Sequence, residues 1–186
     1  APALASACRK VGSLQIRNVA TVAGNVANAQ PAADAAVALS ALGAVFTVID
    51  GRSRRQLAMA EMYQGLHKST VDSSRELISS IHIPCQDAGE ASDFVRLELR
   101  QSLALPMLNV AAMVKMTVGS VVWARIAMAP VGIGPVRSAA AEEWLKGRPL
   151  TEEVINHASE LILTEANPRS NPLRGSREYR LQTLPV

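Results

Sequence analysis

The residues from Arg17 to Asp34 have types and a spacing that could do chemistry. Small residues dominate this segment, and Gly24 has no Cβ, so the backbone could come close to a bound group. Thr21 offers a hydroxyl and Asn25 an amide that tolerates left-handed backbone. Such a loop suits a phosphate, and the carboxylate of Asp34 could accept hydrogen bonds from sugar hydroxyls. The segment therefore predicts a loop that binds a ligand.

The same residues also have a purely structural interpretation. A Gly-Asn pair such as Gly24-Asn25 is an ordinary turn former. An aspartate that opens a helix, as Asp34 does here, is often a cap or a first-turn anion that complements the helix dipole. Both interpretations stay open at the level of single residues, whereas the combination favours a ligand site.

The amino-acid composition indicates a globular protein and argues against several functions. The chain has 186 residues, of which 48% are apolar and 3% aromatic, and a net charge of +3. Because the basic residues are spread out and few aromatic residues interleave with them, nucleic acid is not an expected partner. No apolar run reaches membrane-spanning length, and no signal-peptide pattern opens the chain. We therefore expect no membrane span and a cytoplasmic location.

The reactive side chains do not form a catalytic or metal-binding set. Cys8 and Cys85 stand far apart without a CxxC or Cys/His cluster, so neither a disulfide nor a metal or iron–sulphur site is predicted. The histidines His67, His82 and His157 are scattered, and no Ser/His/Asp or paired-carboxylate set accompanies them. We therefore name no catalytic residue. Since the chain opens without Met, we expect it to be part of a larger protein.

Hydrophobic spacing predicts the elements that must position the Arg17–Asp34 segment. It would lie between two helices, the first followed by Gly12 and the second by Gly43, where helix C′ glycines are common. The expected helices cover residues 4–11, 32–42, 135–147, 151–167 and 174–180. The expected strands cover residues 44–49, 56–59, 76–83, 94–99, 108–118 and 122–128, with a hairpin turn at 50–51 and a helical turn at 60–65.

A polar, Gly-containing stretch at residues 85–92 separates two predicted domains. The first covers residues 1–86 and the second residues 87–186. The second would contain a three-stranded antiparallel sheet followed by helices, which gives an α+β fold. Residues 94–99 alternate apolar with charged side chains, as a half-buried strand does.

Several motifs, in a fixed order, resemble one known family. These motifs are QIRNVATVAGNVANAQPAAD at 15–34, ALSALGAVFTV at 38–48, ELISSIHIP at 76–84, LELRQSLALPMLNVA at 97–111, PVRSAAAEEWLKG at 135–147 and RGSREYR at 174–180. They resemble the FAD subunit or domain of the molybdenum hydroxylases, such as xanthine dehydrogenase and the medium subunit of carbon monoxide dehydrogenase. The resemblance implies the C-terminal part of a two-subdomain FAD-binding domain of the vanillyl-alcohol-oxidase type, followed by a small domain.

The resemblance also implies which residues bind the cofactor. Five consecutive residues would line the diphosphate and ribityl region of FAD: Thr21, Val22, Ala23, Gly24 and Asn25. Asp34 matches the family acid that binds a cofactor hydroxyl, and Ile78 a family aliphatic residue near the flavin. Arg96 stands where a lysine near the flavin is usual. From the residues alone, Ile78 is equally a core residue of a strand and Arg96 a surface charge.

Two departures from the family pattern bear on flavin binding. Ala23 replaces the first glycine of a family pair, so its backbone needs φ below zero or must tolerate strain. The family's first, Gly-rich FAD segment has no counterpart in this sequence. We therefore expect the isolated polypeptide to bind FAD poorly and to be inactive alone.

The implied function is electron transfer within a complex. An iron–sulphur subunit with 2Fe–2S clusters and a molybdopterin subunit would be the partners, and NAD or another acceptor would receive electrons from FAD. The alternative is a truncated or degenerate module of such a complex that only scaffolds the other subunits.

Overall fold

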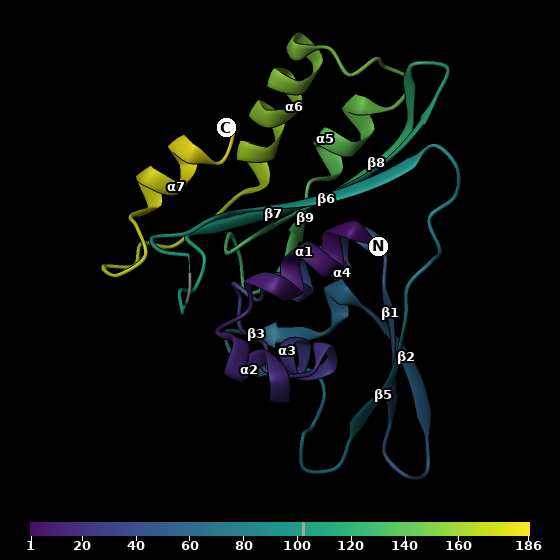
Figure 1. The fold of residues 1–186 in the computed structure, drawn as a ribbon, viewed down its shortest axis with the longest axis vertical. Helices are drawn as coiled ribbons and strands as arrows, with labels where there is room; N and C mark the ends of the chain where they lie inside the picture. Colours follow the sequence, from purple (N-terminus) through teal and green to yellow (C-terminus); the bar gives the residue numbers. More distant parts are fainter. Residues whose placement is uncertain (102) are drawn as a thin grey trace.

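The computed structural model describes residues 1–101 and 103–186 and has an α+β fold with antiparallel sheets (Figure 1). Ser102, which falls within the motif at 97–111, lies outside the described residues. The first half contains α1 (Pro2–Lys10), α2 (Leu14–Val19), α3 (Val22–Ala27), α4 (Asp34–Leu42), β1 (Val45–Ile49), β2 (Arg54–Ala58), a 3-10 turn (Met59–Glu61), β3 (Tyr63–Gly65), β4 (Lys68–Ser69) and β5 (Leu77–His82). The second half contains β6 (Glu90–Leu97), β7 (Leu108–Thr117), β8 (Ser120–Ala129), β9 (Val136–Arg137), α5 (Ala139–Leu145), α6 (Glu152–Glu165) and α7 (Arg177–Thr183).

The β6–β7–β8–β9 sheet is covered on both faces (Figure 1). Helices α5 and α6 pack on one face, and α1 and α4 of the first half pack on the other. The core between α1, α4 and the sheet consists mainly of alanines, with Val37 and Phe94 as larger members. Small side chains let the helix backbones approach the sheet closely, so the two halves share a tight interface.

Helix α4 is buried along its whole length, which its sequence explains. Every residue of DAAVALSAL has a buried side chain, and a helix that is apolar on all sides belongs in a protein interior. Gly43 ends the helix in the left-handed conformation, with φ of 69°, as the sequence predicts. The only charged group on α4 is Asp34 in its first turn, so α4 carries this carboxylate into the core.

The predicted hairpin of the first half is confirmed. Strands β1 and β2 pair antiparallel, and β5 pairs with the other edge of β1. At the turn, Asp50 Oδ1 accepts the backbone N–H groups of Arg52 and Ser53 at 2.9 and 2.7 Å. The predicted helical turn at 60–65 is wrong beyond Glu61, because Tyr63–Gly65 forms strand β3 and pairs with β4.

The second sheet contains one strand that the pattern does not predict. Val136–Arg137 pairs with β8 as β9 and makes the sheet four-stranded. Helix α5 therefore begins at Ala139 and not at Pro135, and Ser138 Oγ caps it by accepting the N–H of Ala141. The last helix likewise begins at Arg177, after the Ser176 cap, and not at 174. No helix in the described residues is long and apolar enough to cross a membrane.

The segment from Arg17 to Asp34 is more regular than a loop. Helices α2 and α3 occupy half of it, with a break at Ala20-Thr21. Asn25 has a helical backbone, and the left-handed residue of the segment is Ala29, with φ of 48°. The sequence pattern missed these two short helices because Gly and Asn are poor helix formers. A side-chain cap at Ser13 for α2 and at Thr21 for α3 supports each helix.

Candidate functional site

The N-terminus of α3 presents backbone donors beside a capping threonine. Thr21 precedes the helix, and its Oγ1 accepts the N–H of Gly24 at 2.9 Å. The first N–H groups of a helix have no acceptor within the helix. Those of Val22 and Ala23 donate to no protein acceptor in the described part of the chain. Two donors at the positive end of α3 are therefore available to an anion.

Gly24 and Ala23 fit this geometry without backbone strain. A Cβ on Gly24 would lie 2.9 Å from Thr21 Oγ1, so glycine leaves room for the capping hydroxyl. Ala23 lies within α3 and is not among the described residues with positive φ. The first glycine of the family pair is therefore unnecessary here, because this backbone has φ below zero.

Asn25 carries a buried acceptor that the described residues do not satisfy. Its side chain is half-buried, and its Oδ1 has no hydrogen-bond partner. Buried polar groups are normally paired, and an unpaired one destabilises the fold by about 1–3 kcal/mol. An unpaired amide oxygen on the same helix as the Val22 and Ala23 donors suggests that a ligand donates to it.

A small pocket lies in front of this helix end. Its volume is about 260 Å³, and the residues that line it come from α1, α2 and the start of α3: Cys8, Arg9, Val11, Arg17, Ala20, Thr21 and Val22. Arg17 is fixed by a hydrogen bond from Nη1 to the Val11 carbonyl at 2.9 Å. Burial raises the pKa of the Cys8 thiol, with a contribution from Asp34, which disfavours the thiolate. Two arginines and the α3 N-terminus border this pocket, and none of the residues that line it is acidic.

Asp34 and Arg96 lie in a different, buried cluster between the two halves. Arg96 Nη1 donates to Asp34 Oδ2 at 2.8 Å, and Asn109 Nδ2 donates to Asp34 Oδ1 at 3.0 Å. The Arg96 side chain is only 2% exposed and that of Asp34 7%. Arg96 also donates to the carbonyl oxygens of Lys10 and Ala104. Both oxygens of Asp34 are thus occupied by donors from the second half of the chain.

Burial and the neighbouring Arg96 shift the pKa of Asp34 in opposite directions. Burial raises the pKa of Asp34 to about 6, and Glu98 adds to the rise. Arg96 and the hydrogen bond from Asn109 oppose it. Glu98 Oε2 lies 2.9 Å from Arg96 Nε and Oε1 lies 3.0 Å from Lys10 Nζ. Arg96 Nε and Glu98 Oε2 make no hydrogen bond although they lie this close, and both are buried without a hydrogen-bond partner.

The inward position of Arg96 corrects the surface interpretation of its strand. Phe94 and Arg96 lie on one face of β6 and contact α1 and α4, Glu98 follows directly after the strand and reaches Lys10 of α1, and Val95 on the other face is 67% exposed. The charged residues therefore occupy the face toward the first half. Sequence reasoning missed Glu98, Lys10 and Asn109 as partners, although the period of two from Phe94 to Glu98 was a usable signal.

Ile78 lies neither at the N-terminus of α3 nor in the Asp34–Arg96 cluster. It is 9% exposed and belongs to the core of the first half with Phe46 and Val26. Val22 and Ala23 pack against the same core, so α3 and β5 share it. The structure thus groups the predicted site residues into α3 with its neighbour Ile78, and separately the Asp34–Arg96 cluster.

Two family comparisons together cover nearly the whole chain. Residues 1–86 match the family described as FAD binding domain in molybdopterin dehydrogenase. Residues 94–185 match the family described as CO dehydrogenase flavoprotein C-terminal domain. Both matches agree with the division of the fold into a half with the α3 site and a half with the four-stranded sheet.

Individual relatives are FAD subunits or medium chains of dehydrogenases. The chain is 32% identical over 156 residues to the nicotinate dehydrogenase FAD-subunit of Eubacterium barkeri, covering 82% of this chain and 53% of that protein. It is 28% identical over 172 residues to the carbon monoxide dehydrogenase medium chain of Afipia carboxidovorans, covering 92% and 59%. The structure of reconstituted CO dehydrogenase from Oligotropha carboxidovorans matches with a TM-score of 0.88 at 26% identity, covering 96% of this chain and 61% of that one.

The first half of the chain thus belongs to the FAD-binding domain family of molybdopterin dehydrogenases, and the second half to the family of CO dehydrogenase flavoprotein C-terminal domains. The chain spans 53% to 61% of the length of the relatives described above. The relatives are subunits of oxidoreductase complexes.

The residues of α3 fit part of an FAD molecule. The free N–H groups of Val22 and Ala23 and the two arginines of the adjacent pocket suit the anionic diphosphate. The unpaired Asn25 Oδ1 suits a hydroxyl donor. Both carboxylate oxygens of Asp34 and both Nη atoms of Arg96 are bonded to protein groups, and the unpaired atoms of their cluster are Arg96 Nε, Glu98 Oε2 and Asn109 Oδ1.

Proposed function

We propose that this chain binds the diphosphate and ribityl part of FAD at the N-terminus of α3. Thr21 would shape the helix end, Val22, Ala23 and Gly24 would supply backbone, and Asn25 would accept a hydrogen bond from the cofactor. The single observation that carries the proposal is the buried Asn25 Oδ1 without a partner, on the same helix as two free N–H groups. Bound FAD would supply the electron-transfer chemistry.

In this proposal the cofactor relays electrons between partners. Electrons would come from iron–sulphur clusters of a partner subunit, after oxidation of substrate at a molybdopterin subunit, and pass to NAD or another acceptor. The family of the chain and the FAD-subunit and medium-chain relatives support this placement. A cytoplasmic location stays a prediction.

Asp34, Ile78 and Arg96 stay predictions as cofactor contacts. The surroundings of Asp34 and Arg96 suggest that these two residues hold the two halves of the subunit in register, since they bond across the interface. Ile78 packs in the core of the first half. The contacts of Asp34 and Arg96 favour the alternative function, a scaffold module without flavin, because protein partners engage two polar groups of the expected site.

The flavin content of the purified assembly, read from its absorption spectrum, distinguishes the two functions. We expect flavin in the wild-type assembly and a several-fold lower content in Asn25→Ala, since one hydrogen bond contributes about 1 kcal/mol. Asn28→Ala is the matched control, because Asn28 is the exposed C-cap residue of the same helix.

Either of two results would count against the proposal. An assembly that holds its partners but no flavin would identify a scaffold. Equal flavin content in Asn25→Ala and Asn28→Ala would remove α3 from the cofactor site while leaving the family assignment intact.

A further inference from the structure

A second electropositive pocket lies between the two halves, away from the α3 N-terminus. Its volume is about 270 Å³. One wall comes from the first half, with Gln30 in the α3–α4 connection and His67 in the β3–β4 turn. The other comes from the α6–α7 loop and α7, with Arg169, Arg174 and Arg180. The residues that line it differ entirely from those of the pocket in front of α3.

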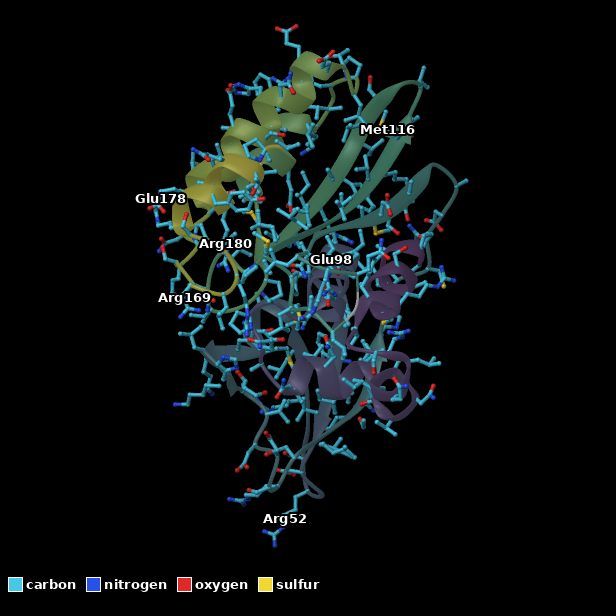
Figure 2. All side chains as sticks on the ribbon, turned by 60° about the vertical axis from the view of Figure 1, so that its left-hand side comes forward. Arg52, Glu98, Met116, Arg169, Glu178 and Arg180 are labelled. Atoms are coloured by element: carbon cyan, nitrogen blue, oxygen red, sulfur yellow. The ribbon has the colours of Figure 1, made fainter. Side chains whose placement is uncertain are left out.

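The three arginines have no acidic counterpart. None of the residues that line the pocket is Asp or Glu, and no salt bridge within the described residues involves Arg169, Arg174 or Arg180. Glu178, two residues before Arg180, points outward from α7 in Figure 2. Three arginines therefore line one small space that no acidic residue lines.

Arg180 is the buried anchor of this pocket. It is 4% exposed, and its Nη1 and Nη2 donate to the carbonyl oxygens of Arg169 and Arg174 at 2.9 and 3.2 Å. Its Nε is buried and has no acceptor in the described part of the chain. Burial and the neighbouring Arg174 and Arg169 lower the pKa of Arg180. A buried guanidinium that is bonded only to neutral carbonyls is unusual, because buried charges are normally paired.

The loop before α7 holds the other two arginines in place. Asn171 N donates to the Gly175 carbonyl at 3.0 Å, and Arg174 N donates to the Asn171 carbonyl at 3.1 Å. Gly175 has φ of 98°, which closes this tight loop in a conformation that other residues rarely adopt. Figure 2 labels Arg169 and Arg180 along this loop and α7. The backbone at Arg169 and Arg174 is therefore fixed, by this loop and by the hydrogen bonds from Arg180.

We propose that this pocket binds the phosphoryl group of a small anion. Arg169 and Arg174 would contact the anion, and Arg180 would position them through its hydrogen bonds to their carbonyl oxygens. Guanidinium groups present N–H forks that match phosphate oxygens, and several forks around one space favour a multiply charged anion. The amide of Gln30 and the imidazole of His67 add donors from the opposite wall. The small volume favours a phosphate or diphosphate group over a folded segment of another protein.

The test is calorimetric titration of the full chain in its assembly with inorganic diphosphate, at constant ionic strength in chloride. We expect saturable binding at one site per chain. Arg169→Gln and Arg174→Gln should each weaken it about tenfold, the effect of one charge-assisted contact. Arg177→Gln is the matched control, because it removes the same charge from an exposed residue outside the pocket.

The outcomes separate this site from flavin binding. We expect Arg174→Gln to keep wild-type flavin content and unfolding temperature, so that loss of diphosphate binding reflects the pocket alone. Absence of saturable binding, or equal weakening by Arg177→Gln, would overturn the proposal. A glutamate-rich peptide that displaced diphosphate at lower concentration would also overturn it and assign the pocket to an acidic partner segment. Loss of flavin in Arg174→Gln would show that the pocket is not a separate site.

Discussion

The start of α3 and the Asp34–Arg96 cluster both contain polar groups, but they differ in which of these groups have protein hydrogen-bond partners. At α3 two N–H groups and the Asn25 Oδ1 have no protein partner among the described residues. In the cluster, both oxygens of Asp34 accept hydrogen bonds, and Arg96 Nη1 and Nη2 donate to three acceptors. At α3 the unpaired groups lie on a helix whose end borders a pocket, whereas in the cluster Asp34 and the Arg96 Nη atoms join two halves of the subunit while Arg96 Nε, Glu98 Oε2 and Asn109 Oδ1 stay buried without a partner.

Unpaired buried atoms occur in both regions, so they do not by themselves distinguish binding residues from structural ones. The Asp34–Arg96 ion pair joins two segments of the chain and stabilises their interface only as long as both partners are present. The unpaired Asn25 Oδ1 lies on the same helix as two free N–H groups, where FAD would complete it. Substitutions in the cluster should therefore change stability, and substitutions at α3 should change ligand content.

The largest expected effect is that of Arg96→Met. It removes the cation and leaves the Asp34 carboxylate buried beside Glu98, so the free energy of unfolding should fall by about 3–5 kcal/mol. Urea denaturation measures it. Arg52→Met at the exposed hairpin tip (Figure 2) removes the same charge and should leave stability unchanged. Equal stability of the two variants would show that the cluster does not join the halves.

The pH dependence of stability should come partly from Asp34. Its folded pKa of about 6 lies above the ordinary 3.8, so the folded state holds the proton more tightly. The stability from this group is fully present below pH 3.8 and is lost as the pH rises through about 6. The loss is on the order of 3 kcal/mol.

Asp34→Asn should remove that pH dependence. Urea denaturation of wild type and variant between about pH 4 and pH 7 measures the difference in slope. Asp87→Asn, which changes an exposed carboxylate, is the control. A variant that kept the wild-type slope would show that Asp34 stays ionised throughout, held by Arg96.

The smallest effects are expected at α3. Thr21→Ala removes the cap to the Gly24 N–H and should lower the free energy of unfolding by about 1 kcal/mol. Asn25→Ala should not lower it, because Asn25 Oδ1 has no partner to lose and its removal relieves a buried unpaired acceptor. Thermal unfolding in the absence of flavin measures both. A greater loss in Asn25→Ala than in Thr21→Ala would assign Asn25 a structural role.

Local signals predicted much of the fold because they act over short distances. Asp50-Gly51 marked the β1–β2 hairpin, and Gly43 the end of α4. The sequence pattern did not predict the short strand β9 or the helices α2 and α3, because elements of two to six residues have little periodicity. Their existence depends on a neighbouring strand or on a single capping side chain.

The sequence by itself determined the family, the two sheets and the segment from Arg17 to Asp34 as the place of interest. Motif order and residue types suffice for that, because they are properties of the chain. Only the tertiary structure decided that Thr21–Asn25 and Asp34 belong to different environments. Whether a polar atom is satisfied depends on partners such as Arg96 and Asn109, which are distant in the sequence and arrive only when α4 packs against β6 and β7.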